Sequence, residues 1–103
     1  MAGELIWSRG ALDDLEAIAT FVARDSPLYA SRLVARIVDQ AERLLGQSQP
    51  GSRIPELPLD QVREQRLGGF RLLFERQGED LHLLAVVHVD QSPHFALSRP
   101  GQP

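Results

Sequence analysis

Apolar residues recur every three or four positions near the start of the chain. This spacing predicts an amphipathic helix between Arg9 and Asp25. The apolar residues of the segment are Leu12, Leu15, Ile18, Ala19 and Val22. Ser8 stands just before them, where its hydroxyl can accept a bond from a free backbone N–H of the first turn. We therefore expect a helix that begins after Ser8 and turns one apolar side towards a core.

A second, longer helix is predicted directly after the first. Ser26 can cap it, and Pro27 at the first helical position has no N–H to leave unpaired. Its apolar stripe consists of Ala30, Leu33, Val34, Ile37, Ala41, Leu44 and Leu45. Gly46 is suited to a left-handed helix stop. The tight corner between the two helices predicts an antiparallel hairpin.

The second half of the chain has the twofold alternation of β-strands. Three β-rich runs, 62–66, 70–76 and 81–89, are separated by Gly68-Gly69 and by a four-residue turn at 77–80. These runs predict an antiparallel meander. The side chains expected to face the helices are Phe70, Leu72 and Phe74 in the second run and Leu81, Leu83, Ala85, Val87 and Val89 in the third.

Two further segments complete the predicted fold. Residues 4–7 include a short apolar run and form an expected edge or joining strand. The Pro- and Gly-rich segment 47–60, which includes Pro58, is expected to be a surface loop. Together the elements predict an α+β fold. An N-terminal strand and an antiparallel helix hairpin pack on one face of a small antiparallel sheet that ends in the meander. We expect one domain over residues 1–97 and a flexible tail at 98–103.

Composition and charge exclude several classes of function. The 103 residues include 11 basic and 14 acidic side chains, for a net charge of −3, so direct DNA binding through bulk attraction is not expected. There is no Lys for a Schiff base and no Cys for a nucleophile or disulfide. We find no metal-ligand spacing or cofactor motif and expect neither group. No apolar run spans a bilayer and no leader is visible, which predicts a cytoplasmic protein without a membrane partner.

One predicted hairpin brings two polar side chains to the same face of the sheet. Counting back across the turn at 77–80 places Arg71 opposite Val86 and diagonal to His88. Arg71 and His88 are therefore expected to share the face that points away from the helices.

The other hairpin adds two residues to that face. With Gly68-Gly69 as a two-residue turn, Arg66 lies opposite Arg71 and Glu64 lies opposite Leu73. The predicted polar constellation consists of Glu64, Arg66, Arg71 and His88.

Each polar residue also has a structural interpretation. Glu64 and Arg66 are typical of solvated edge-strand charges. Arg71 interrupts an apolar run near the sheet centre, where a guanidinium needs a carboxylate, phosphate or water partner, so function and structural pairing are equally open. A lone histidine at a strand end, such as His88, is more often structural than catalytic. His94 lies in a predicted loop, where the sequence does not fix its position.

Several motifs follow one another in a characteristic order. Residues 6–18 contain an apolar strand, a serine and then Ala-x-x-Asp-Leu-x-x-Ile, and residues 22–27 form the corner between the helices. Downstream follow Pro50-Gly51, Pro55-Glu56, Arg63-Glu64, Gly69-Phe70-Arg71-Leu72-Leu73-Phe74 and Val87-His88. This ordered set, which covers roughly Leu5 to Val89, resembles the toxins of the ParE/RelE superfamily, also called the plasmid stabilisation protein family.

The resemblance implies a growth-inhibiting toxin of a type II toxin–antitoxin system that a protein antitoxin neutralises. ParE-like members inhibit DNA gyrase, whereas RelE-like members enter the ribosome and cut mRNA. For a RelE-like ribonuclease, the resemblance implies that Arg71 stabilises phosphate charge, with Glu64 as general base and His88 as general acid. An interaction module of the same fold without toxicity is a third interpretation.

Two departures favour the ParE-like alternative, which is a gyrase inhibitor and not an enzyme. The lysines of RelE-like enzymes are replaced by Val62 and Glu64, and the chain is acidic. The antitoxin is expected either to add a strand at residues 4–7 or to place a helix beside the hairpin. Homodimers and toxin–antitoxin hetero-oligomers both remain open. The residues expected at the interface with the target or the antitoxin are Arg63, Arg66, Arg71, His88 and His94.

Overall fold

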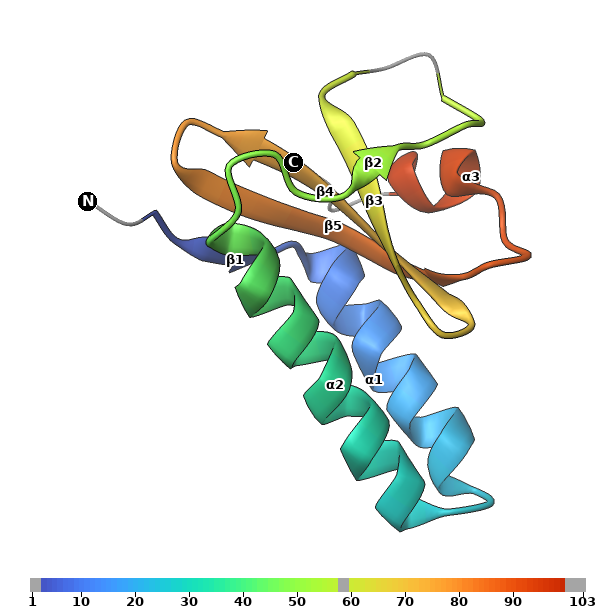
Figure 1. Cartoon of the computed structure of the whole chain (residues 1–103). Coiled ribbons are helices and arrows are strands. Elements are labelled where there is room, and N and C mark those ends of the chain that lie inside the picture. The colour runs from blue at the N-terminus through green and yellow to red at the C-terminus, as the bar shows by residue number, and fades with distance from the viewer. Residues whose placement is uncertain (1–2, 58–59, 100–103) are drawn as a thin grey trace.

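The computed structural model describes residues 3–57 and 60–99 and has a helix hairpin on one side of a five-stranded sheet. Figure 1 shows the hairpin against one side of the strands and a short helix on the other side, near β2. The elements in chain order are β1 (Leu5–Trp7), α1 (Arg9–Ala23), α2 (Pro27–Leu45), β2 (Ser52–Arg53), β3 (Val62–Leu67), β4 (Phe70–Gln77), β5 (Asp80–His88) and α3 (Pro93–Leu97). The expected α+β class is confirmed.

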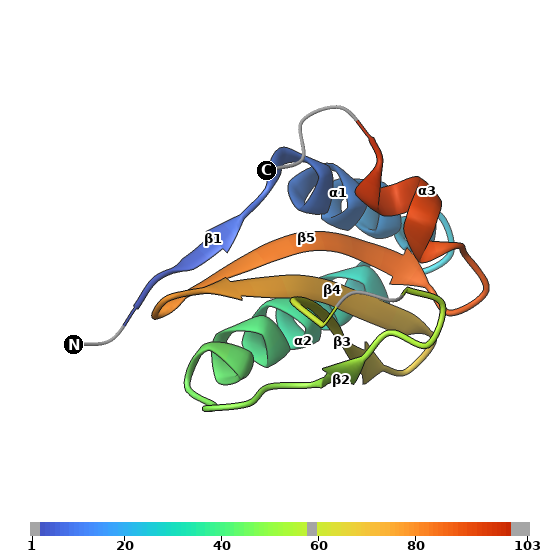
Figure 2. The ribbon, with the colours of Figure 1, turned by 90° about the horizontal axis from the view of Figure 1, so that it is seen from above.

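The sheet has the strand order β1-β5-β4-β3-β2 and is mostly antiparallel. Figure 2 shows β1 beside β5 and β2 close to β3. β1 runs parallel to β5, and the meander β3, β4 and β5 is antiparallel as predicted. The segment 47–60, expected to be only a loop, contributes the two-residue strand β2; Pro58 lies outside the described residues.

Helix α1 begins as its sequence predicts. The Ser8 hydroxyl accepts a hydrogen bond from the backbone N–H of Ala11 at 3.0 Å, which satisfies one free donor of the first turn. The buried side of α1 differs from the predicted stripe at its first residue: Ala11 is fully buried, whereas Leu12 is 52% exposed. Ala11 belongs to the core cluster between the sheet and the hairpin, and the larger Leu12 lies outside it.

Helix α2 is capped at its two ends by different means. Ser26 accepts from the N–H of Tyr29, with Pro27 following at the first position, as predicted. At the other end Gly46 is not left-handed, since its φ is −79°. The guanidinium of Arg76 instead donates to the carbonyl oxygens of Leu44, Leu45 and Gln47. A cation at this end is also favoured by the helix dipole.

A β-bulge changes the predicted register of β4 against β5. Leu73 pairs with Ala85 and Phe74 pairs with Leu83, so β5 has one more residue, Leu84, than β4 across this point. Alternation therefore reverses along β5 after the bulge. Leu81 and Leu83 face the helices as expected, but Ala85 and Val87 lie on the opposite face.

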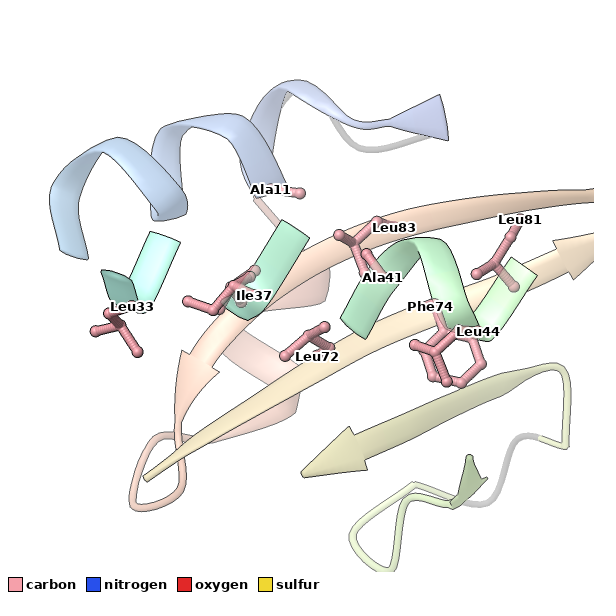
Figure 3. Close-up of a cluster of buried hydrophobic side chains, with 10 residues drawn as sticks. Ala11, Leu33, Ile37, Ala41, Leu44, Leu72, Phe74, Leu81 and Leu83 are labelled. Atoms are coloured by element: carbon pink, nitrogen blue, oxygen red, sulfur yellow. The ribbon is translucent and has the colours of Figure 1, made fainter. Parts of the chain in front are cut away.

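The buried side chains form one cluster on each side of the sheet. The cluster between sheet and hairpin is drawn in Figure 3; its buried members are Ala11, Leu33, Ile37, Ala41, Leu44, Leu72, Phe74, Leu81, Leu83 and Val86. Leu72 and Phe74, which were predicted to face the helices, belong to this set, and Phe70, the third predicted position of β4, packs against it. On the other side, α3 and the loop after β2 cover a second cluster, which consists of Ile54, Leu57, Val62, Leu73, Leu84, Ala85, Val87 and Ala96. Two layers thus cover the sheet where one was predicted.

Helix α1 also covers the outer edge of β5 beyond the end of β1. The Ser8 hydroxyl donates to the carbonyl of Leu84, and a carboxylate oxygen of Asp14 accepts from the N–H of Val86 at 2.9 Å. The guanidinium of Arg99 donates to both oxygens of the same Asp14 carboxylate. The chain after α3 is therefore attached to α1 at Arg99, and residues 100–103 of the expected tail lie outside the described residues. Among the described helices, none has the length and hydropathy to cross a membrane.

Candidate functional site

A buried guanidinium lies at the centre of the predicted polar constellation. Arg71, on β4, is 0% exposed. Its Nε donates to Oε1 of Glu64 at 2.6 Å, and its two terminal nitrogens donate to the two carboxylate oxygens of Glu56 at 2.8 Å each. A guanidinium buried without such partners would lose its hydration without compensation. The carboxylate partner that the sequence required is thus present twice, and the triad carries a net charge of −1.

The β3–β4 hairpin places Glu64 beside Arg71. Arg66 pairs with Arg71 across the two-residue turn, as predicted, so Glu64 lies two positions further along β3 on the same face. A diagonal pair of this kind is within reach of long side chains. Arg66 is at the rim, where its Nε lies 3.9 Å from Oε1 of Glu64 and its side chain is largely exposed.

The loop after β2 supplies Glu56. Ile54 and Leu57 are buried in the second cluster, and the N–H of Leu57 donates to the carbonyl of Ile54 in a tight turn. This turn directs Glu56 at Arg71. In the sequence, Pro55-Glu56 belongs to a motif, but no pattern there predicts a role for Glu56. A buried Arg71 requires carboxylate partners, which was the one indication in the sequence. The loop conformation that brings Glu56 to Arg71 does not follow from any local periodicity.

The contacts between Arg71 and Glu56 stabilise the charged forms of both side chains. The bidentate hydrogen bonds from Arg71 lower the pKa of Glu56 from 4.5 to about 2. The same bonds raise the pKa of Arg71 above its ordinary value. Bidentate pairing of a carboxylate with a planar guanidinium is among the strongest charged contacts in proteins. As folded, Arg71 has no exposed surface with which to contact a phosphate, so the triad acts as a clamp between the sheet and the loop.

His88 does not belong to this constellation, contrary to the predicted register. The bulge moves β5 by one residue, so Arg71 pairs with Val87 and His88 pairs with Phe70. The imidazole and the Phe70 ring meet edge-on, with centroids 5.9 Å apart. Because Phe70 and Arg71 are neighbours in a strand, their side chains point to opposite faces. His88 therefore lies on the helix side of the sheet and Arg71 on the other.

The other predicted interface residues are bound to the loops. Arg63 donates to the carbonyl oxygens of Pro50 and Gly51, which holds the chain before β2 against β3. His94 lies on α3 and not in a loop, and its Nε2 is 3.1 Å from the carbonyl oxygen of Glu56. Arg63 and His94 thus support the same loop that carries Glu56.

Three residues have clear structural roles that the sequence pattern does not predict. Asp14 and Arg99 join α1 to the chain after α3, and Arg76 caps α2. The hydrogen bonds from Arg99 to Asp14 raise the pKa of Arg99 above its ordinary value. These contacts connect positions 85 and 32 residues apart, so no local pattern predicts them.

An apolar groove lies on the helix side of the sheet. It has a volume of about 610 Å³ and runs between α1, the start of α2 and the ends of β4 and β5 that meet there. Its walls are Asp14, Ala17, Ile18, Phe21, Val22, Tyr29, Leu33, Phe70, Val86, His88 and Gln91. Phe21 is 68% exposed and Tyr29 is 53% exposed. Figure 1 shows the tip of the hairpin, where α1 ends and α2 begins, extending beyond the strands. Exposed aromatic surface beside a groove is typical of a protein interface.

Comparisons with known proteins agree with this fold. The sequence profile described as "ParE toxin of type II toxin-antitoxin system, parDE" matches residues 5–93. A solved structure described as "Chromosomal ParDE TA system from P. aeruginosa" is similar at a TM-score of 0.71 and 26% identity. The similarity covers 87% of this chain and 98% of that one. The search of curated proteins returns no match. Since the family profile spans most of the described residues, the chain belongs to the ParE toxin family of type II toxin–antitoxin systems.

Proposed function

We propose that this chain is a cytoplasmic ParE-like toxin that inhibits DNA gyrase by binding to it and that an antitoxin neutralises. The observation that carries the choice of target is the buried clamp of Arg71, Glu56 and Glu64. A ribonuclease needs a guanidinium that can reach the phosphate in the transition state. Arg71 is buried and bound by two carboxylates, so the geometry supports a binding function over RNA cleavage.

The position of His88 supports the same choice. A general acid has to lie within hydrogen-bond reach of the group to which it gives a proton. His88 and Arg71 lie on opposite faces of the sheet, which separates the three residues that a RelE-like mechanism requires. The acidic net charge of −3 also suits a protein target better than the phosphate-rich ribosome.

The apolar groove is the docking site that we propose for the antitoxin. Membership in a toxin–antitoxin family implies an antitoxin partner. The groove offers the exposed rings of Phe21 and Tyr29 as anchors for an amphipathic helix. The alternative site, the edge of β1, is only three residues long. The assembly that follows is a toxin–antitoxin hetero-oligomer.

The test of this function is induced expression of the chain with and without the reading frame beside its own. We expect growth arrest that the neighbouring product relieves, accompanied by loss of plasmid supercoiling and by intact mRNA. Purified chain should then inhibit gyrase supercoiling in the absence of ribosomes. Cleavage of mRNA on translating ribosomes would contradict gyrase as the target, and absence of arrest would contradict toxicity.

Two substitutions differ in how well they separate catalysis from binding. Arg71→Ala would break the clamp and destabilise the fold, so loss of toxicity in that variant does not identify a catalyst. His88→Ala is the better probe of chemistry, since the His88 side chain is half-exposed. If the chain acts by binding gyrase, the His88→Ala variant should leave mRNA intact and should still reduce plasmid supercoiling at least in part.

A further inference from the structure

Helix α1 presents two adjoining surfaces that share a boundary. One is the wall of the apolar groove, and the other is a shallow depression lined by Asp13, Glu16, Ala17, Thr20, Phe21 and Arg24. Ala17 and Phe21 line both. A partner segment that lies in the groove and crosses the exposed ring of Phe21 would therefore also contact the depression.

The depression is polarised along the helix axis. Asp13 and Glu16 lie one turn apart on the same side of α1, and neither forms a salt bridge with any residue that the structure describes. Arg24 lies beyond the other end of the helix, with its guanidinium carbon 5.9 Å from the centroid of the Phe21 ring. The surface beside the groove thus has two carboxylates without a salt bridge at one end and the guanidinium of Arg24 at the other.

We propose that this polarity selects the antitoxin segment and fixes its direction in the groove, an inference that rests on the proposed function. The segment carries apolar side chains that pack on Phe21, Tyr29 and the groove floor. It places a Lys or Arg side chain against Asp13 and Glu16. The opposite direction would bring that cation to Arg24, and like charges in contact disfavour a wrong pairing.

The charges are expected to act mainly on association and on partner choice. Exposed charges steer two proteins together over about a Debye length, roughly 8 to 10 Å at physiological salt. The apolar contacts of the groove hold the segment once it has docked. Antitoxins of other modules that lack a cation at the matching position would then bind this chain more slowly.

The test is the binding of the antitoxin encoded beside this chain to a charge-reversed toxin, Asp13→Arg with Glu16→Arg. We expect the affinity to fall by about tenfold or more, chiefly through a slower association rate, and the difference to shrink at high salt. One Lys→Glu or Arg→Glu substitution in the antitoxin should restore binding to the reversed toxin. Glu16→Arg alone is included because Asp13 also acts on the charge of Arg99.

A matched control makes the same change of net charge elsewhere. Glu42 and Glu79 are exposed and line a different depression, near the end of α2. Glu42→Arg with Glu79→Arg should leave the affinity within about twofold of the original. The inference is overturned if the reversed toxin binds as well as this control. It is also overturned if the loss of affinity is independent of salt and no antitoxin substitution restores binding. Failure of the unaltered chain to bind the antitoxin at all would instead overturn the proposed function.

Discussion

Arg71 and Glu64 are joined by a hydrogen bond of 2.6 Å between side chains that are both almost completely buried. They lie on neighbouring strands, and Glu56 completes the coordination of the guanidinium from the loop. A buried ion pair of this kind is costly to desolvate. Replacing both partners therefore costs less stability than removing one partner and leaving the other charge buried.

We predict that Arg71→Ala lowers the free energy of unfolding by about 3 to 5 kcal/mol, because it leaves the Glu64 carboxylate buried without its guanidinium. Arg71→Met combined with Glu64→Gln should cost less than the sum of the two single substitutions, by about 1 to 3 kcal/mol. Urea denaturation of Arg71→Ala measures the first quantity, and urea denaturation of the four proteins in the double-mutant cycle measures the second. Additive costs would show that the two residues are not energetically coupled.

The contact of Arg71 with Glu56 predicts a pH dependence of stability. The pKa of Glu56 is lowered from 4.5 to about 2 by its hydrogen bonds with Arg71. Because the pKa in the folded state lies below the unfolded value, the stabilisation is fully present above about pH 4.5. It is lost as the pH falls towards 2. The stability difference between the original chain and Glu56→Gln should therefore shrink over this range. A difference that stays constant from pH 6 to 2.5 in chemical denaturation would contradict the role of this contact.

Gly51 and Gly68 both have positive φ, 63° and 57°, but differ in their surroundings. A Cβ at position 51 would lie 2.3 Å from the carbonyl oxygen of Glu64, whereas nothing lies within 4 Å of a Cβ at position 68. Gly68→Ala should cost about 1 to 2 kcal/mol for the left-handed backbone alone. Gly51→Ala should cost clearly more, because β3 has to move as well. Equal thermal midpoints for the two variants would contradict this ranking.

Asp14 connects α1, β5 and the chain after α3. Arg99→Ala removes the ion pair and the hydrogen bond from Arg99 to the carbonyl oxygen of Ala96, whereas Asp14→Ala removes the ion pair and leaves the N–H of Val86 without its acceptor at 2.9 Å. An unsatisfied buried N–H costs about 1 to 3 kcal/mol, so Asp14→Ala should be the more destabilising of the two by that margin. Hydrogen exchange should show faster exchange at Val86 in Asp14→Ala only. Loss of protection at Val86 in Arg99→Ala would mean that the carboxylate is held in place by Arg99.

Phe21 and Leu12 form a matched pair for the groove. Both are exposed on α1, at 68% and 52%, but only Phe21 lines the groove. Phe21→Ala should weaken antitoxin binding at least tenfold with little change in stability, as expected of an aromatic anchor. Leu12→Ala should leave binding within about twofold. Calorimetric titration with the antitoxin separates the two, and an equal effect of both substitutions would place the docking site elsewhere.

The local elements of this chain follow from its sequence. Ser8, Ser26 and Pro27 define where the helices begin, since they satisfy or remove the free N–H groups of a first turn. Gly68-Gly69 defines the β3–β4 hairpin, and through it the sequence determined that Glu64, Arg66 and Arg71 share a face. These features depend on residues within a few positions of one another.

Tertiary structure alone decided what surrounds these residues. The bulge at Leu84 separated His88 from Arg71, because an extra residue in one strand reverses every side chain beyond it. The second carboxylate on Arg71 came from a loop 15 residues away, and the cap of α2 came from Arg76 on a different element. Hydrophobic periodicity carries no information on such contacts. They depend on how layers pack and on which buried polar groups then require partners.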